Sequence, residues 1–67
     1  MYIGQFVTIR PAFSFTGEEA DILGHCAGHV TEMVDNDVCV KLLGKIELDG
    51  YLTDEVWVTT RRIKVAA

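Results

Sequence analysis

The sequence predicts a single all-β domain, residues 1–67, built from five short strands, and three observations lead to this prediction. The chain has 67 residues, which is the length of one small domain. Stretches rich in β-branched and aromatic residues alternate in polarity with the period of two that strands require. Asp49-Gly50 lies between two such stretches, and this dipeptide is among the strongest hairpin signals. A chain of this length buries about 60% of its unfolded surface, so we expect a thin core.

The first predicted strand covers Tyr2–Arg10 and ends at Pro11, because proline has no N–H to donate to a strand ladder. A long loop follows this strand. Within the loop, Thr16–Gly24 begins with a Thr-x-x-Glu capping pattern and ends at a glycine. This pattern is compatible with one or two turns of helix or with an ordered loop.

The next two predicted strands, Gly28–Val34 and Val38–Leu43, form a hairpin. The residues between them read Asp-Asn-Asp. Such residues tolerate a left-handed backbone and hydrogen-bond to their own main chain, which is typical of a tight turn.

A second hairpin is predicted from Lys45–Leu48 and Tyr51–Thr60 around Asp49-Gly50, because both central residues of a type I′ turn need positive φ. Gly44 interrupts the strand that leads into this hairpin. We therefore expect a bulge or a bend at Gly44.

The chain then has room between Thr59 and Arg62 for one tight 3₁₀ turn, before a last short strand around Ile63–Val65. The alternation of each strand also predicts which side chains point inward. Eight apolar residues are expected in the core, namely Val7, Ile9, Val30, Val38, Val40, Val56, Val58 and Ile63.

The order of these elements resembles the SH3-like barrel layout. The stretches that carry the resemblance are "GQFVTIRP", "GHVTEMVDNDVCVKLL" and "DEVWVTTRRIKV", and together they cover nearly the whole chain. Proteins with this layout include photosystem accessory subunits, ferredoxin–thioredoxin reductase variable chains, ribosomal and elongation-factor modules, and the plasmid-borne trimethoprim-resistant dihydrofolate reductases. The resemblance implies a small, closed or nearly closed β-barrel with a long first loop, and it implies no particular function.

The dihydrofolate reductases of this group are the enzyme alternative, because their tetramers form an active pore between very small barrels. Their pattern places Val-Gln-Ile-Tyr on the strand before the last turn, where this chain has Val56, Trp57, Val58 and Thr59. The glutamine and tyrosine that contact folate and nicotinamide are absent, and Trp57 would fill the pore. An oligomeric, reductase-like enzyme is therefore the least favoured interpretation.

Composition describes an ordinary globular protein with 49% hydrophobic and 24% charged residues. No apolar run approaches the roughly 18 residues of a membrane-spanning helix, and the first residues lack the features of a signal peptide. Cys26 and Cys39 are the only cysteines. Without an export signal, two thiols in a reducing compartment are the simplest expectation, so we predict a cytoplasmic protein that does not contact membranes.

Both histidines and one cysteine fall in "GHCAGH", which raises the possibility of a metal site or a reactive thiol. His25, Cys26 and His29 supply three zinc ligands at most, where a structural site needs four. On an extended strand the two histidines would be about 13 Å apart, too far to share one ion. No third residue is evident to orient a Cys26–His29 nucleophile pair. We interpret these residues as strand residues and predict no catalytic, metal-binding or cofactor-binding residue.

Trp57 is the strongest candidate for a binding residue. If Val56 and Val58 point into the core, the alternation turns Trp57 outward, and exposed tryptophans are typical of interfaces. Phe13 and Phe15 in the long loop, with Arg61 and Arg62 after the strand, complete the predicted interaction surface, and "RRIK" beside Asp54 and Glu55 would form its charged rim. The alternative is that Phe13 or Phe15 folds back over Trp57 and covers it. The sequence therefore favours a small non-catalytic assembly module that forms a homodimer or tetramer and could also bind another protein.

A nucleic-acid-binding barrel is the alternative that the basic residues suggest. It would use Trp57 to stack on bases and would contact phosphates with a basic set, namely Arg10, Arg61, Arg62 and Lys64. The net charge of −4 opposes this alternative, because phosphate-backbone binders normally carry a basic excess.

Overall fold

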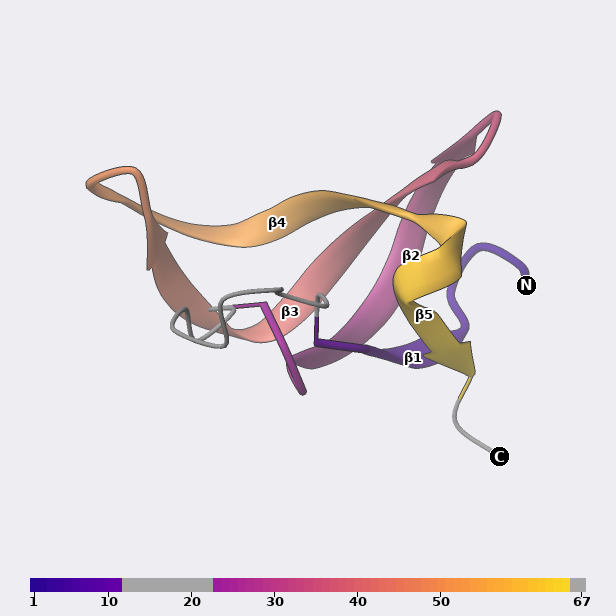
Figure 1. Ribbon diagram of the computed structural model, residues 1–67, viewed down its shortest axis with the longest axis horizontal. Coiled ribbons are helices and arrows are strands. Elements are labelled where there is room, and N and C mark those ends of the chain that lie inside the picture. The colour runs from indigo at the N-terminus through magenta and orange to yellow at the C-terminus, as the bar shows by residue number, and fades with distance from the viewer. Residues whose placement is uncertain (12–22, 66–67) are drawn as a thin grey trace.

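The structure is a computed structural model that describes residues 1–11 and 23–65, and it is all-β as predicted (Figure 1). The predicted helix or loop over Thr16–Gly24 lies outside the described residues, apart from its last two. No helix in the described part of the chain is long and apolar enough to cross a membrane. The strands are β1 (Phe6–Ile9), β2 (Ala27–Val34), β3 (Asp37–Leu48), β4 (Tyr51–Thr59) and β5 (Ile63–Val65), and a 3₁₀ helix, η1 (Thr60–Arg62), precedes β5.

The five strands form one antiparallel sheet in the order β4-β3-β2-β1-β5. Of the two predicted alternatives, a closed or a nearly closed barrel, the closed one is wrong. The two edge strands, β4 and β5, do not pair with each other in the described part of the chain, so the sheet stays open. The physical reason is the connection between them: η1 spans only Thr60–Arg62, and it turns the chain so that β5 pairs with β1.

Strand β1 is shorter than the predicted Tyr2–Arg10. Gly4 has a φ of +90°, which is a conformation that glycine adopts readily, and the Gln5 N–H donates to the Tyr2 carbonyl at 3.1 Å. The chain therefore turns before Phe6, although the Gly4 N–H still donates to Val30 of β2 at 2.6 Å.

Both predicted hairpins are confirmed. The turn between β2 and β3 is tight, and Asp35 in it has a φ of +53°. In the second hairpin, Asp49 and Gly50 have φ values of +51° and +83°, which are the two positive values that a type I′ turn requires. Strand pairing then continues from Leu48 opposite Tyr51.

The bulge expected at Gly44 is also confirmed, and β3 runs through it without ending. Lys41 lies opposite Glu55 and Ile46 lies opposite Thr53, so residues 42–45 of β3 face Asp54 alone. Extra residues on one strand bend it and increase its local twist. The β3–β4 hairpin beyond the bulge extends away from the η1 end of the molecule (Figure 1).

All eight predicted core residues are buried, and every strand contributes at least one of them. Because side chains from β1 to β5 meet in one cluster, the open sheet must curve around its own core. Leu42 joins the cluster as a residue that was not predicted, and Leu23, Cys26, Ile46 and Leu48 pack against it. Six of the nine buried cluster members are valines, so the core is thin, as the chain length indicated.

The first testable consequence concerns Val40, which has no exposed surface. The substitution Val40→Asp should abolish cooperative folding, because an unpaired carboxylate at this depth has no partner and no water. Thermal denaturation followed by circular dichroism measures the effect. Val65→Asp is the matched control, since Val65 is partly exposed at the end of β5, and it should melt close to the wild-type temperature. A cooperative melt of Val40→Asp near that temperature would contradict the assigned core face.

The second consequence concerns Gly28 on β2. A Cβ atom at this position would overlap the main-chain carbonyl of Lys41 and the Cα of Leu42 on β3, and main-chain atoms in a paired strand cannot move aside. Gly28→Ala should lower the free energy of unfolding by about 3 kcal/mol. Gly44→Ala should change it by less than about 0.5 kcal/mol, because nothing lies within 4 Å of a Cβ there. Equal effects in urea denaturation would mean that β2 and β3 are not this close.

Candidate interaction surface

The side chains of β1 to β4 that point away from the core form a continuous surface, which we call the outer face. Its residues align because antiparallel partners share a face of the sheet. One row crosses all four strands, through Glu55 on β4, Lys41 on β3, His29 on β2 and Phe6 on β1. All four of these side chains are exposed.

A second row of the outer face contains Trp57. It lies opposite Cys39 of β3, which in turn lies opposite Glu32 of β2. The Trp57 side chain is 51% exposed while Val56 and Val58 on either side of it are buried, which confirms the predicted outward orientation. The outer face thus presents the large aromatic side chain of Trp57 beside a row that contains the charged side chains of Glu55 and Lys41.

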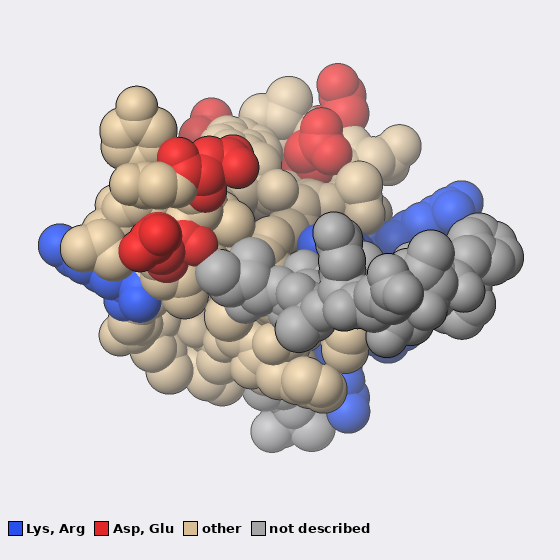
Figure 2. Space-filling model, turned by 60° about the vertical axis from the view of Figure 1, so that its left-hand side comes forward, with Lys and Arg blue, Asp and Glu red and all other residues tan. Residues whose placement is uncertain are grey.

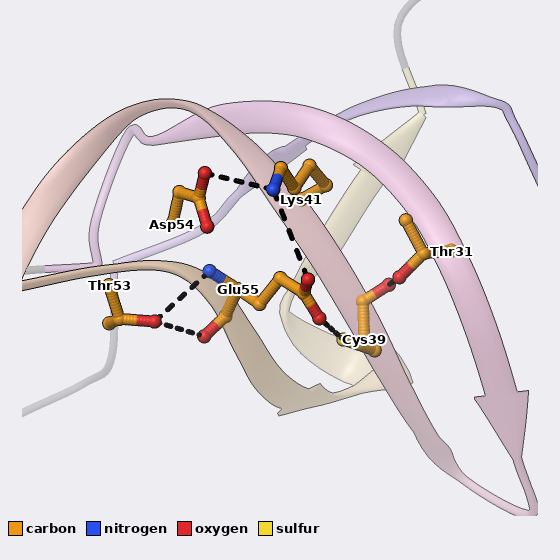
Figure 3. A network of polar contacts seen from close by, with 6 residues as sticks. All are labelled: Thr31, Cys39, Lys41, Thr53, Asp54 and Glu55. Carbon is orange, nitrogen blue, oxygen red and sulfur yellow. Dashed lines mark hydrogen bonds and ion pairs between the residues drawn. The ribbon is translucent and has the colours of Figure 1, made fainter.

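Cys39 is only 3% exposed although it lies on the outer face. Its Sγ is 3.8 Å from Oε2 of Glu55, and the Thr31 hydroxyl donates to its main-chain carbonyl at 3.3 Å (Figure 3). Trp57 is its direct neighbour on β4. The thiol is therefore almost fully covered, and the Glu55 carboxylate lies beside it. Both cysteine side chains are thiols rather than halves of a disulfide, as predicted.

Lys41 is the charged centre of the outer face. Its Nζ lies 2.9 Å from Oδ2 of Asp54 and 3.9 Å from Oε1 of Glu55 (Figure 3). The hydrogen bond with Asp54 raises the pKa of Lys41 above its usual value and lowers the pKa of Asp54 below its usual value. The Lys41 side chain is half exposed, so water screens the pair and its contribution to stability is small. The predicted interaction surface had placed these acids beside "RRIK", whereas both contact Lys41.

The Thr53 side chain forms hydrogen bonds with main-chain groups at the unpaired edge of β4. Its hydroxyl accepts a hydrogen bond from the Glu55 N–H at 3.2 Å and donates one to the Glu55 carbonyl at 3.1 Å (Figure 3). Exposed main-chain groups on an edge strand invite another strand to pair with them. Because the side chain of Thr53 occupies both groups of Glu55, strand addition at this point of β4 is blocked.

The residues of "GHCAGH" point in different directions. His25 precedes β2, Cys26 is half-buried and packs against the core, and His29 lies on the outer face. The His29 ring stands edge-on to Phe6, with 5.3 Å between the ring centres. Among residues 1–11 and 23–65, no three histidine, cysteine, aspartate or glutamate side chains come together as a metal site would require.

Of the predicted interaction residues, Phe13 and Phe15 lie outside the described part of the chain. Arg61 is exposed on η1. Arg62 is half-buried, and its Nε and Nη2 both donate to the Arg10 carbonyl, at 3.1 and 3.0 Å. This bond gives the Arg62 guanidinium a structural role, because it fastens η1 to the end of β1.

Three exposed apolar residues of the β3–β4 hairpin were not predicted from the sequence. Leu43, Tyr51 and Leu52 lie on the β3–β4 hairpin and are 68%, 76% and 71% exposed. The alternation of polar and apolar residues along the strands does not distinguish these three residues from their neighbours. The bulge at Gly44 and the Asp49-Gly50 turn were the available signals, because a bulge changes the alternation and the tip of a hairpin is usually exposed.

Charge is unevenly distributed over the surface. In the view of Figure 2, acidic side chains gather in the upper half, while basic ones lie toward the left and right ends.

Comparisons of the chain with protein-family models, curated proteins and solved structures found no match.

The ion pair of the outer face leads to the third testable consequence. In Asp54→Asn, the pKa of Lys41 should fall back toward the ordinary value of a lysine, because its hydrogen bond to a charged partner is lost. Glu55→Gln is the matched control and should lower that pKa less, since Glu55 is the more distant carboxylate. Titration of the Lys41 side chain by NMR measures both.

The direction of the linked pH dependence follows from the same shifts. The lowered pKa of Asp54 means that the pair stabilises the fold above the ordinary carboxyl pKa of about 3.9 and ceases to do so as the pH falls through the lowered value. The raised pKa of Lys41 means that this stabilisation is lost again as the pH rises through the raised lysine value. An unchanged Lys41 titration in Asp54→Asn would show that the two side chains do not interact in solution.

Proposed function

We propose that the protein is a small, non-catalytic interaction and assembly module that associates with a second copy of itself through the outer face. The observation that carries the proposal is the exposure of Trp57 at the middle of β4, beside the buried thiol of Cys39. Trp is among the residues most enriched at the energetic centres of protein interfaces. It presents a large rigid surface while losing little conformational entropy on binding.

The charges around Trp57 support association between identical copies. The outer face carries both signs, with Lys41 opposite Glu55 and with Glu32 in the row of Trp57. A two-fold axis places the same face on both subunits, so each copy's cations can lie against the other's acids. A face of one sign would repel its own copy.

The energetics are favourable at moderate concentration. A tryptophan side chain has about 200 Å² of surface, so burying the exposed half removes about 100 Å² from water, worth about 2.5 kcal/mol per subunit. Further apolar surface is available, because Phe6 and Val34 are also exposed on β1 and β2. A thin core gains stability from such a contact.

Three further parts of the proposal rest on sequence reasoning. The SH3-like resemblance is supported by the order of the elements, with a long segment after β1 and a 3₁₀ turn before β5. We also propose a cytoplasmic location, which the two thiols support, because a reducing compartment keeps cysteines in this form. Nucleic acid is a less favoured partner than protein, because Arg62 is bonded to the Arg10 carbonyl and the net charge is −4.

The experiment that tests the proposal is sedimentation equilibrium at micromolar concentration. The wild type should form a dimer or tetramer, and Trp57→Ala should be monomeric with its circular dichroism spectrum unchanged, because Trp57 contributes no core contact. Tyr51→Ala is the control, since it removes an even more exposed aromatic side chain from the hairpin tip, and it should associate as the wild type does. A monomeric wild type contradicts self-association, and dispersal by Tyr51→Ala alone would move the interface to the hairpin.

A further inference from the structure

A hollow of about 420 Å³ lies where the end of β1 meets β5, on a part of the molecule that Trp57 does not reach. This volume is within the usual range of small-molecule sites. The hollow draws on β1, the chain on either side of the long loop, and β5. Its described lining residues are Thr8, Ile9, Arg10, Pro11, His25 and Lys64.

The polar lining of this hollow is basic. Arg10, His25 and Lys64 supply a guanidinium, an imidazole and an ammonium group, and none of the described lining residues is acidic. All three side chains are exposed, so their polar ends are accessible to a ligand. The protein has a net charge of −4, so the charge of this lining is opposite in sign to that of the molecule as a whole.

The main chain around the hollow is fixed by hydrogen bonds between segments far apart in sequence. The Arg10 N–H donates to the Arg62 carbonyl at 2.6 Å, and the Arg62 guanidinium donates back to the Arg10 carbonyl. The Thr8 hydroxyl donates to the Lys64 carbonyl at 3.4 Å. These hydrogen bonds fix the distance between the main-chain segments that carry the Arg10 and Lys64 side chains.

His25 is held in the same way and in an uncommon conformation. Its N–H donates to the Ile9 carbonyl at 2.8 Å, and the Ile9 N–H donates to the Cys26 carbonyl at 2.8 Å. The φ of His25 is +66°, in the left-handed region that few residues other than glycine adopt. Residues held in such conformations cluster at binding sites, where the surrounding structure maintains the strain.

We propose that this hollow binds the phosphate monoester group of a small molecule. Guanidinium and ammonium groups form charge-assisted hydrogen bonds with phosphate oxygens, and a guanidinium can contact two oxygens at once. A phosphate monoester dianion has three terminal oxygens and two negative charges, so each of the three donors can have an oxygen of its own, whereas a carboxylate has two oxygens and one charge. A single phosphate group also fits an isolated basic hollow better than a nucleic-acid backbone does, since the latter needs a long basic stripe. The site is independent of the outer face.

The test uses the two histidines of the chain as probe and internal control. NMR spectra of the imidazole side chains are recorded while inorganic phosphate, or glycerol phosphate as the monoester, is added at constant ionic strength and pH. The His25 signals should move and saturate with a dissociation constant of about 1 mM or lower. The His29 signals should stay in place, because that ring lies on the outer face against Phe6. Equal or unsaturable shifts of both histidines would overturn the proposal.

A pair of lysine variants makes the test specific. Lys64→Gln should weaken phosphate binding about tenfold, because it removes one charge-assisted hydrogen bond. The fold should survive, since Lys64 is exposed and its contact with Thr8 uses the main-chain carbonyl. Lys45→Gln removes an exposed lysine from the distant hairpin and should leave the affinity unchanged. Equal affinities in the two variants would contradict the site.

The source of the phosphate is decided by competition. Glycerol phosphate should displace inorganic phosphate from His25, and a short single-stranded oligonucleotide without a terminal phosphate should not. Displacement by the oligonucleotide at a lower concentration than by the monoester would overturn the small-molecule proposal in favour of a nucleic-acid backbone.

Discussion

The close approach of β2 and β3 at Gly28 is the constraint on which the rest of the structure depends. With no side chain at this position, the main chain of β2 lies directly against Lys41 and Leu42. That contact fixes the pairing register, and in a strand a shift of one residue would exchange the two faces. It therefore places Val30 and Val40 in the core and, by the same parity, turns His29 and Lys41 outward.

A second constraint acts at the other end of the sheet. The turn of η1 directs the chain so that β5 pairs with β1, and the reciprocal bonds between Arg10 and Arg62 hold η1 against the end of β1. The same bonds that leave the sheet open also bring Lys64 beside Arg10 and Thr8. The unpaired edges of the sheet and the basic hollow thus both result from the way η1 connects β4 to β5.

Much of this arrangement was predictable from the sequence, because the signals were local. Positive φ at Asp49 and Gly50 follows from residue type alone, and the burial of residues such as Val38 follows from alternation. The predictions that were wrong depend on how distant parts of the chain lie relative to one another. Closure of the sheet depends on the angle set by η1, which no short pattern encodes. The choice of Lys41 as the partner of Asp54 depends on the bulge, since it sets which β3 residue lies nearest.

The pairing of β5 with β1 also determines when the protein can fold. Ile9 lies opposite Ile63, so the last strand completes the sheet beside the first one. Contacts between such distant parts of a chain are slow to form, because a long loop must be closed before they stabilise anything. On the ribosome, β1 to β4 would emerge with one side of β1 still uncovered. The fold is therefore completed only after synthesis has passed Val65, as a late and cooperative step.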